Sequence, residues 1–427
     1  MSIGLENRNF SLGFSEPWGR PSSLRRPGDR FDTEWLATPR NLVLMAKDRS
    51  IGFGVLQATV EGPEGWSLPV RWPSPDAPPA DVVARDRSVT VRGAIDFGPC
   101  RLDVTARWTL RAGEISASWE LRNEGRKRAR LGELGWLLPL NTNYGRPQRT
   151  RRNLERMYRR QVIEHAFAGG YSAWVLAERV GREGECLFLA ADDRTPFGYY
   201  DYDCIHYTDR TAFTDRAPYA PPARDKAARA AYKSIGNHFP WPGVLRVFAA
   251  AESLLQRHGQ TSWPTPVSAI SIPAGDSVHF GVAMCWLPNR DHIVARQEKT
   301  GQIGVRLLPS PVIPRDDETF LAVACKERGT PKPSAGVTAR ARRSASGRQC
   351  FKLSVSRPGP CHLDLRRPNG RRTRILLFGV TPLPRLMRSR ARRIHEEQYH
   401  ERPRHTLDGA ILIRHNPSGQ LLSLIHI

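Results

Sequence analysis

In RLDVTARWTLRAGEISASWELRN, residues 101–123, apolar side chains stand at every second position on both sides of a short turn. A period of two places alternate side chains on opposite faces of a strand. Two such runs around a turn that contains Gly113 predict an antiparallel hairpin with one buried and one solvated face. Trp108 and Trp119 fall on the buried face, where each ring would bury roughly 150–250 Å². Because such a hairpin is unstable alone in water, more strands and a facing layer are expected.

The same alternation recurs through the first two thirds of the chain, for example over residues 10–14 and 278–284. Residues 131–140 are almost all apolar, which predicts a strand that is covered on both faces. Residues 151–167 show a weak helical spacing. The sequence therefore predicts a mainly β protein whose first domain, residues 1–291, is a large antiparallel β super-sandwich.

Residues 302–381 predict a second, smaller domain. Short apolar segments recur there with Pro and Gly between them, as in an immunoglobulin-like β-sandwich. Residues 384–400 predict a linker or docking helix, because Pro384 suits a first-turn position and apolar residues share one face. Residues 401–427 read as the start of a further domain. The last six residues, LSLIHI, resemble a translated sequencing adapter, so we expect a truncated chain that lacks a C-terminal domain.

The composition suits a loop-rich β protein, since 427 residues include 35 Pro and 35 Gly with 40% hydrophobic residues. No run of 18 apolar residues predicts a membrane span, so no membrane partner is expected. The first residues show no signal-peptide pattern. Cysteine usage favours a reducing, cytoplasmic compartment, and an extracellular location stays open if the true start lies upstream.

The cysteines are odd in number and have no CxxC spacing, so most are expected to be buried free thiols. A bridge between Cys350 and Cys361 is left open. The seven cysteines are Cys100, Cys186, Cys204, Cys285, Cys325, Cys350 and Cys361.

The formal net charge of +23 comes from 65 Lys and Arg against 42 Asp and Glu. Nearly all of the positive residues are Arg, and they are spread over every segment. We interpret this pattern as a solvated Arg-rich surface, with a polyanion-binding surface as the alternative. Nucleic acid is not the expected partner, and an acidic polysaccharide would use the same charge.

Residues 115–123 and 131–135 resemble the super-sandwich of the galactose-mutarotase-like superfamily. More specifically, the chain resembles a bacterial domain-of-unknown-function family (number 5695). Three stretches carry the match: FDTEW at 31–35, IPAGDS at 272–277, and residues 305–316 with the helix that follows. The resemblance implies a super-sandwich, an immunoglobulin-like module and then an (α/α) toroid, as in glycoside hydrolase and polysaccharide lyase-like enzymes. It also implies that the acid and base belong to the toroid, which is absent here.

Glu34 and Trp35 form the first candidate glycan-binding pair. An aromatic ring can stack on the apolar face of a pyranose while a carboxylate accepts hydrogen bonds from its hydroxyls. The alternative is a capped turn with Trp35 in the core.

The second candidate is the aromatic segment 195–203, in which Tyr199, Tyr200 and Asp201 are typical of a carbohydrate-contacting loop. The alternative is an edge strand whose Tyr side chains alternate between core and solvent. His206 follows as a further candidate substrate-binding residue, where it could act as a general acid; the alternative is an ordinary polar residue.

Motifs of several enzyme classes are absent from the sequence. The histidines show no HxxxH or HxH spacing, and no Cys and His residues have zinc-ligand intervals. No Walker A motif, GxSxG or strand-linked GxGxxG is present. We therefore assign no catalytic residue and expect neither a metal nor a cofactor.

These observations favour a carbohydrate-active protein, of which this chain is the N-terminal, non-catalytic portion. Its sandwich would form one wall of a glycan-binding cleft, with an oligo- or polysaccharide and the missing C-terminal domain as partners. The alternative is a non-catalytic binding or structural protein whose basic surface meets polyanions. A mutarotase-like enzyme is not favoured, because no pair of His residues is followed by a carboxylate at sugar-site positions.

Overall fold

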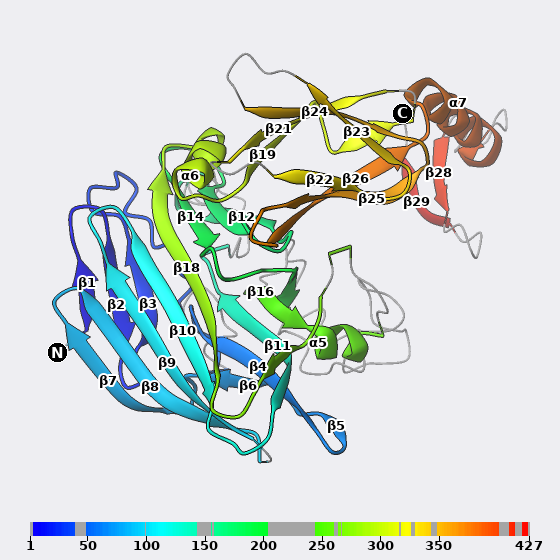
Figure 1. Ribbon diagram of the computed structural model, residues 1–427. Helices are drawn as coiled ribbons and strands as arrows, with labels where there is room; N and C mark the ends of the chain where they lie inside the picture. The colour runs from blue at the N-terminus through cyan, green and yellow to red at the C-terminus, as the bar shows by residue number, and fades with distance from the viewer. Residues whose placement is uncertain are drawn as a thin grey trace. The chain divides into compact units, whose positions relative to one another are not determined.

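The chain is mainly β-strand and divides into two compact units in a computed structural model (Figure 1). The first unit comprises residues 1–304, 324–330 and 365–374, and the second comprises 305–323, 331–364 and 375–427. The structure describes residues 3–38, 48–98, 100–142, 155, 158–203, 244–259, 264–265, 267–315, 317–325, 329–342, 348–400, 410–414 and 421–425. None of the helices described there is long and apolar enough to cross a membrane.

The first unit is built from two large antiparallel sheets and a small one. The eight-stranded sheet has the order β12 (Val162–Phe167), β13 (Trp174–Arg179), β14 (Cys186–Ala191), β18 (Ser277–Leu287), β10 (Ile115–Asn123), β9 (Arg101–Leu110), β8 (Ser88–Asp96) and β7 (Pro79–Arg85). The seven-stranded sheet has the order β15 (Tyr199–Asp203), β16 (Val244–Ala251), β11 (Ala129–Leu138), β4 (Leu56–Gly62) and β5 (Gly65–Trp66), with β17 (Ile270–Ile272) on β11 and β6 (Val70–Trp72) on β4. The small sheet holds β1 (Gly4–Glu6), β2 (Ser11–Ser15) and β3 (Arg20–Arg25).

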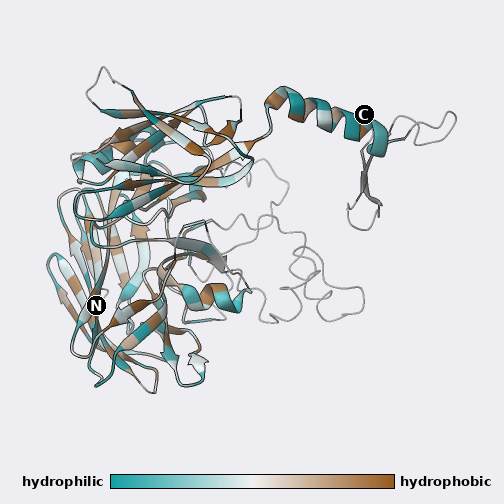
Figure 2. Cartoon of the chain, turned by 45° about the vertical axis from the view of Figure 1, so that its right-hand side comes forward, coloured by the Kyte–Doolittle hydropathy of each residue, from teal (hydrophilic) through white to brown (hydrophobic). Residues whose placement is uncertain are grey.

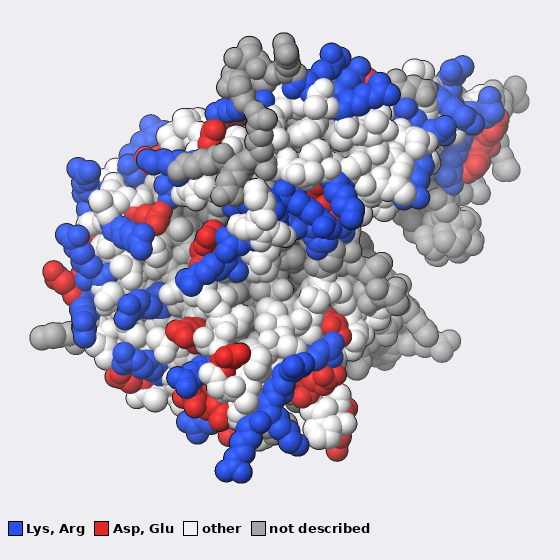
Figure 3. Space-filling view, in the orientation of Figure 1, with Lys and Arg blue, Asp and Glu red and all other residues white. Residues whose placement is uncertain are grey.

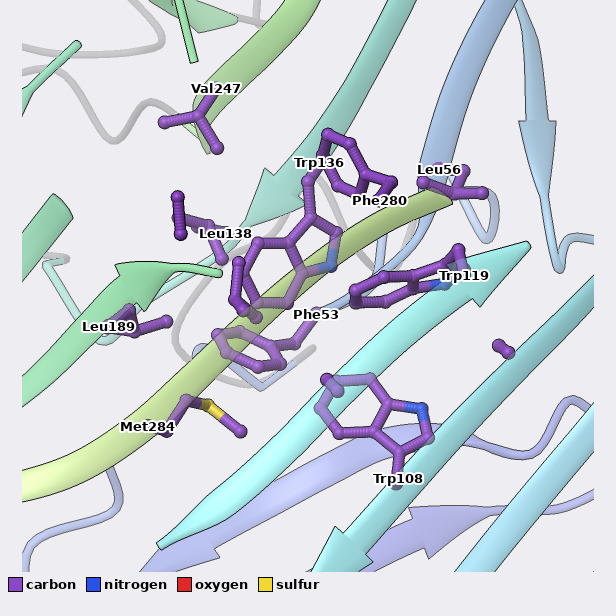
Figure 4. Close-up of a cluster of buried hydrophobic side chains, with 14 of the residues drawn as sticks. Phe53, Leu56, Trp108, Trp119, Trp136, Leu138, Leu189, Val247, Phe280 and Met284 are labelled. Carbon is purple, nitrogen blue, oxygen red and sulfur yellow. The ribbon is translucent and has the colours of Figure 1, made fainter. Parts of the chain in front are cut away.

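The predicted hairpin is confirmed as β9 and β10, which pair antiparallel around the turn at 111–114. Trp108 and Trp119 are 2% and 1% exposed, and their ring centroids lie 5.5 Å apart with an edge-to-face geometry. Trp136 belongs to β11 in the other large sheet, and its ring centroid lies 5.0 Å from that of Trp119 (Figure 4). The main core therefore lies between the two large sheets, as alternate inward-facing residues predict.

Hydrophobic and hydrophilic residues alternate in colour along many strands (Figure 2). Strand β11 departs from this pattern and is buried along nearly its whole length, as its apolar sequence predicts. Leu134, Trp136 and Leu138 face the main core. Leu137 faces the other way, into a separate cluster with Val55 and Val244. The prediction that this strand is covered on both faces is confirmed.

The helical spacing over 151–167 predicts the wrong element for its second half. Within the described residues of that segment, 158–160 are helical, but Val162–Phe167 form β12. Strand β12 pairs with β13 from Val162 opposite Arg179 to Phe167 opposite Trp174. Pairing with a neighbouring strand thus overrides a weak local preference.

Two short helices cover outer faces of the large sheets. Helix α5 (Glu252–Arg257) buries Leu254 and Leu255 against Tyr199 and Phe248 of the seven-stranded sheet. The 3₁₀ turn η1 (Arg290–His292) leads into α6 (Ile293–Lys299). Ile293 joins a cluster with Cys285 and other apolar residues on the outer face of the eight-stranded sheet.

The second unit contains two four-stranded sheets and a C-terminal helical segment. One sheet has the order β19 (Gly304–Leu308), β21 (Thr319–Ala324), β24 (Gln349–Val355) and β23 (Val337–Arg342). The other has the order β20 (Val312–Pro314), β26 (Arg372–Val380), β25 (Gly359–Arg366) and β22 (Thr330–Pro333), and β20 runs parallel to β26. The immunoglobulin-like assignment stays a prediction.

The helix expected over 384–400 is present, with different ends. Helix α7 spans Leu383–Arg393 and continues as a π-helical turn over Ile394–Gln398. The last two expected residues form β27 (Tyr399–His400), which pairs with β28 (Ala410–Arg414). Strand β29 (Leu421–Ile425) completes a third sheet in this unit.

All six cysteines within the described residues are free thiols, as expected. Cys186, Cys285 and Cys361 are buried, and Cys100, Cys325 and Cys350 are half-buried. The bridge between Cys350 and Cys361, which the sequence left open, is not formed. Cys204 lies outside the described residues.

Candidate functional site

A network of charged and polar side chains crosses the seven-stranded sheet on the face turned away from the main core. Five neighbouring strands contribute one residue each: Asp201 from β15, Arg246 from β16, Glu133 from β11, Gln57 from β4 and Arg71 from β6. The residues beside them in sequence, such as Val247, Leu134 and Leu56, point into the main core. The period of two thus places the five polar side chains together on the opposite face.

Arg246 and Asp201 form a bidentate ion pair at one end of the network. Arg246 Nε donates to Asp201 Oδ1 at 2.8 Å, and Arg246 Nη2 donates to Asp201 Oδ2 at 2.7 Å. The two side chains are 7% and 16% exposed. Their direct pairing follows from strand register, because Asp201 stands opposite Arg246 in the ladder between β15 and β16. Two parallel charge-assisted bonds fix the guanidinium plane.

Gln57 connects the charged residues at the centre of the sheet. Its Nε2 donates to Glu133 Oε2 at 2.6 Å. Its Oε1 accepts from Arg246 Nη1 at 3.3 Å and from Arg71 Nε at 3.3 Å. Arg71 also donates to Asp48 Oδ2 at 2.9 Å. Both ends of the amide are therefore used, which fixes its orientation.

Glu133 is a fully buried carboxylate, with 0% exposure. It accepts from Gln57 and from Ser253 Oγ at 3.0 Å, and it forms an ion pair with Arg257 of α5. Burying an unpaired carboxylate would cost several kcal/mol, so these partners are what makes its position tolerable. Helix α5 supplies two of them, and its packing therefore determines the geometry around Glu133.

Tyr199 and His258 extend the network with groups that are uncharged near neutral pH. Burial, with a further contribution from Asp201, raises the pKa of Tyr199 to about 12, so its hydroxyl keeps its proton. Partial burial and the neighbouring Arg246 and Arg257 lower the pKa of His258. The site therefore combines charged side chains with side chains that are uncharged near neutral pH.

This arrangement is chemically better suited to binding polar groups than to proton transfer. Asp201 and Glu133 are each tied to a guanidinium group. Gln57 and Glu133 are buried and use their polar atoms within the network, so its more exposed members, such as Asp201 and Arg257, are the ones that a ligand could reach. No group of three or more His, Cys, Asp or Glu side chains in the described part of the chain is arranged to hold a metal ion.

In the structure, contacts within the first unit occupy the side chains of both Glu34 and Trp35. Glu34 is 15% exposed and accepts from the backbone N–H groups of Leu24 at 2.8 Å and Leu36 at 3.1 Å. Trp35 is 1% exposed, and its ring centroid lies 5.0 Å from that of Trp286. These contacts match the alternative interpretation, a capped turn with Trp35 in the core.

The second candidate segment contributes one residue to the network directly. Tyr199 is 3% exposed and packs on Phe248, whereas Tyr200 is half-buried on the main-core side. Strand β15 does lie at the end of its sheet, as the alternative interpretation expects. Its two Tyr side chains alternate between the cluster under α5 and the main core, however, and neither is exposed to solvent. Asp201 is the predicted residue that joins the five-strand network. His206 lies outside the described residues.

Four of the five residues of the network were missed by sequence reasoning: Arg246, Glu133, Gln57 and Arg71. Arg246 interrupts the otherwise apolar strand VLRVFAAA. Glu133 and Gln57 lie in ARLGELGWLL and LQATVEG, which contain further polar residues, and Arg71 lies in the short strand VRW. Polar residues at such positions must find buried partners, so their presence was a usable signal.

Comparison with solved structures identifies the fold. Over 98% of the chain the structure is similar to a polysaccharide lyase, with a TM-score of 0.67 and 16% sequence identity. The match covers 53% of that lyase, so the present chain spans about half of its length. At this identity the comparison establishes a shared fold.

Weaker matches cover about two thirds of the chain. A galactose mutarotase-like protein from Lactobacillus casei is matched over 67% of this chain and 100% of its own, with 13% identity and a TM-score of 0.38. A galactose mutarotase-like protein from Clostridium acetobutylicum is matched over 67% and 95%, with 8% identity and a TM-score of 0.40. No family model and no curated protein matches the sequence, and membership of the domain-of-unknown-function family stays a prediction.

Proposed function

We propose that this chain is the N-terminal, non-catalytic portion of a carbohydrate-active protein of the glycoside hydrolase or polysaccharide lyase kind. In this proposal the outer face of the seven-stranded sheet forms one wall of a glycan-binding cleft. The observation that carries it is the network from Asp201 through Arg246 and Gln57 to Glu133. The fold shared with a polysaccharide lyase supports it.

The physical argument rests on fixed geometry. A sugar presents several hydroxyl groups at set spacings, and a protein gains affinity when its own polar groups need no reordering on binding. The bidentate pair and the doubly bonded Gln57 amide satisfy this condition. Asp48 at 35% exposure, Arg257 at 29% and Asp201 at 16% are the residues of the network and its flanks through which a ligand would first make contact.

The predicted substrate-binding residues enter the proposal unequally. Asp201 and Tyr199 belong to the network or lie beside it, and Tyr200 flanks them on the same strand. Glu34 and Trp35 could contact a ligand only if they gave up their present contacts with Leu24 and Trp286. His206 remains a prediction.

A glycan array followed by calorimetry on the intact chain tests the proposal. We expect specific binding that survives about 0.3 M salt, where the Debye length is roughly 6 Å. Asp201→Asn should lower the affinity for the glycan selected on the array by about tenfold, which is the equivalent of one charge-assisted hydrogen bond. The matched control is Arg30→Gln, which removes one side of an exposed ion pair with Glu183. Absence of binding to every neutral and acidic glycan, or an equal loss in both variants, would overturn the proposal.

A second candidate function is non-catalytic binding to polyanions. The net charge of +23 favours it, and Lys and Arg outnumber carboxylates on the face shown in Figure 3. Retention on heparin and on DNA that falls steeply with salt would support this function, because phosphate and sulfate contacts release counterions. Retention of a specific glycan at high salt would support the first function.

A further inference from the structure

Two guanidinium groups and one imidazole converge on a single buried carboxylate at the edge of the eight-stranded sheet. Glu178 of β13 is 3% exposed. Its Oε1 accepts from Arg290 Nη2 at 2.6 Å and lies 2.9 Å from His165 Nε2 and 3.8 Å from Arg182 Nε. All of these residues belong to the first unit. This sheet is not the one that carries the network through Asp201.

Three different elements hold the cluster together. His165 and Glu178 come from the paired strands β12 and β13, where Glu178 stands opposite Ile163. Arg290 begins the 3₁₀ turn η1, whose first residues are held by Asn289. Arg182 follows β13 with a left-handed backbone (φ 56°), and its N–H donates to Arg179 O at 2.8 Å. The three side chains therefore approach Glu178 from positions that the fold fixes.

The cluster carries more positive charge than its own carboxylate balances. Glu178 supplies one negative charge, and Arg182 and Arg290 supply two positive charges before any proton on His165 is counted. Neighbouring Glu183 and Glu185 are engaged by Arg30 and Arg26. A surplus cation beside a buried anchor differs from an ordinary surface ion pair, in which the charges match.

The outer sides of the three basic groups face solvent. Arg290, Arg182 and His165 are 40%, 65% and 38% exposed, although their shared partner is buried. Among the described residues, Glu178 is the partner of both guanidinium side chains, so most of their N–H groups stay available. Each of the three basic side chains thus contacts Glu178 on one side and presents N–H groups to solvent on the other.

We propose that Arg290, Arg182 and His165, held in place by Glu178, form a binding site for an oxyanion such as a carboxylate or sulfate group on a glycan or a phosphate group. A guanidinium fork matches the paired oxygens of these groups, and two forks with an imidazole can surround one of them. Glu178 acts as a positioning residue, because it touches the three donors and not the ligand. The inference does not depend on the glycan site at Asp201.

Calorimetry on the intact chain measures binding of four probes, and the variants separate the effect of the guanidinium shape from the effect of its charge. The probes are a galacturonate hexasaccharide, a heparin-derived hexasaccharide, inorganic phosphate and, as a neutral reference, cellohexaose. Arg290→Lys keeps the charge and the pairing with Glu178 but removes the planar fork, so we expect about tenfold weaker binding of the acidic probe that binds. Arg182→Gln should give a loss of similar size. Circular dichroism and thermal unfolding establish that each variant folds.

The matched controls are Arg30→Lys and Arg30→Gln, since Arg30 is 69% exposed and pairs with Glu183 in the same unit. They should leave affinity within about twofold of the parent. Binding of the galacturonate or heparin probe identifies the oxyanion as part of a glycan, and binding of phosphate alone identifies a phosphate site. The inference is overturned if no acidic probe binds, if cellohexaose binds equally well, or if the Arg30 variants lose as much affinity as the Arg290 and Arg182 variants.

Discussion

Removing the charge of Asp201 should destabilise the first unit far more than removing a carboxylate from an exposed pair. Asp201→Asn keeps the shape of the side chain but leaves Arg246, 7% exposed, without the carboxylate that it pairs with. Breaking a buried ion pair in this way costs about 3–5 kcal/mol. Asp201 itself is 16% exposed and Arg246 keeps its bond to Gln57, so we expect the lower end, about 3 kcal/mol.

A double-mutant cycle isolates the pair. Arg246→Met replaces the guanidinium with an apolar side chain and should cost about 2 kcal/mol, because the carboxylate that remains is partly reached by water. The double variant buries no charge at either position, so it should be only about as unstable as the Arg246→Met single variant. The expected coupling energy is therefore about 3 kcal/mol.

Urea unfolding followed by tryptophan fluorescence measures these differences, since Trp108, Trp119 and Trp136 report on the same core. The exposed pair Arg30–Glu183, at 69% and 48% exposure, provides the reference cycle, with an expected coupling below about 1 kcal/mol. A coupling energy for Asp201 and Arg246 no larger than that of the reference pair would refute the claim that the network is preorganised.

Three further predictions follow from the core and from the shifted pKa values. Trp119→Ala should lower the free energy of unfolding by about 3–5 kcal/mol in urea titrations, because the ring contacts aromatic residues from both sheets; a loss below about 1 kcal/mol would contradict its central place. Burial raises the pKa of the Cys285 thiol to about 11, so a thiol reagent at pH 8 should modify it only after unfolding. Burial of Asp29 is outweighed by hydrogen bonds from Thr33 and Phe31 and by the charge of Arg179, which together lower the pKa of Asp29. The ionised Asp29 carboxylate therefore stabilises the folded state above the ordinary Asp pKa near 3.9, and this stabilisation disappears as the pH falls through the lower pKa of the folded state. The Asp29→Asn variant should be less stable than the parent at pH 6, and the two free energies of unfolding should converge in acid. A constant difference between Asp29→Asn and the parent across that pH range would show that Asp29 acts by shape alone.

The hairpin around Trp108 and Trp119 could be predicted because its signal is local. Each strand shows which of its faces is buried through its own alternation, so neither needs information from distant residues. The same holds for β11, whose nearly unbroken apolar run predicts cover on both sides. The helix prediction for the second half of 151–167 was wrong for the opposite reason. Pairing with β13 decides the conformation of that segment, and its own sequence does not show which strand it pairs with.

The candidate site was harder to predict because its members are far apart in sequence and meet only through strand order. Gln57 and Arg246 are 189 residues apart, yet their side chains share a hydrogen bond. That contact requires β4, β11 and β16 to be neighbours, which no local pattern specifies. The aromatic segment 195–203 pointed to Asp201 through its composition alone, and its actual partner, Arg246, carries no motif.

The strands themselves nevertheless contain the information that a site exists on this face. A charged residue in a strand with apolar neighbours on either side must be buried or must face a solvated surface, and Glu133 is buried. Burial of its charge is tolerated only with partners, and the nearest candidates are polar interruptions in other apolar strands. Gln57 and Arg246 are such interruptions, and the structure joins all three. A hydrophobic residue of similar size would satisfy packing at each position at lower cost, and this cost is a further argument for the glycan-binding wall that we propose on this sheet face.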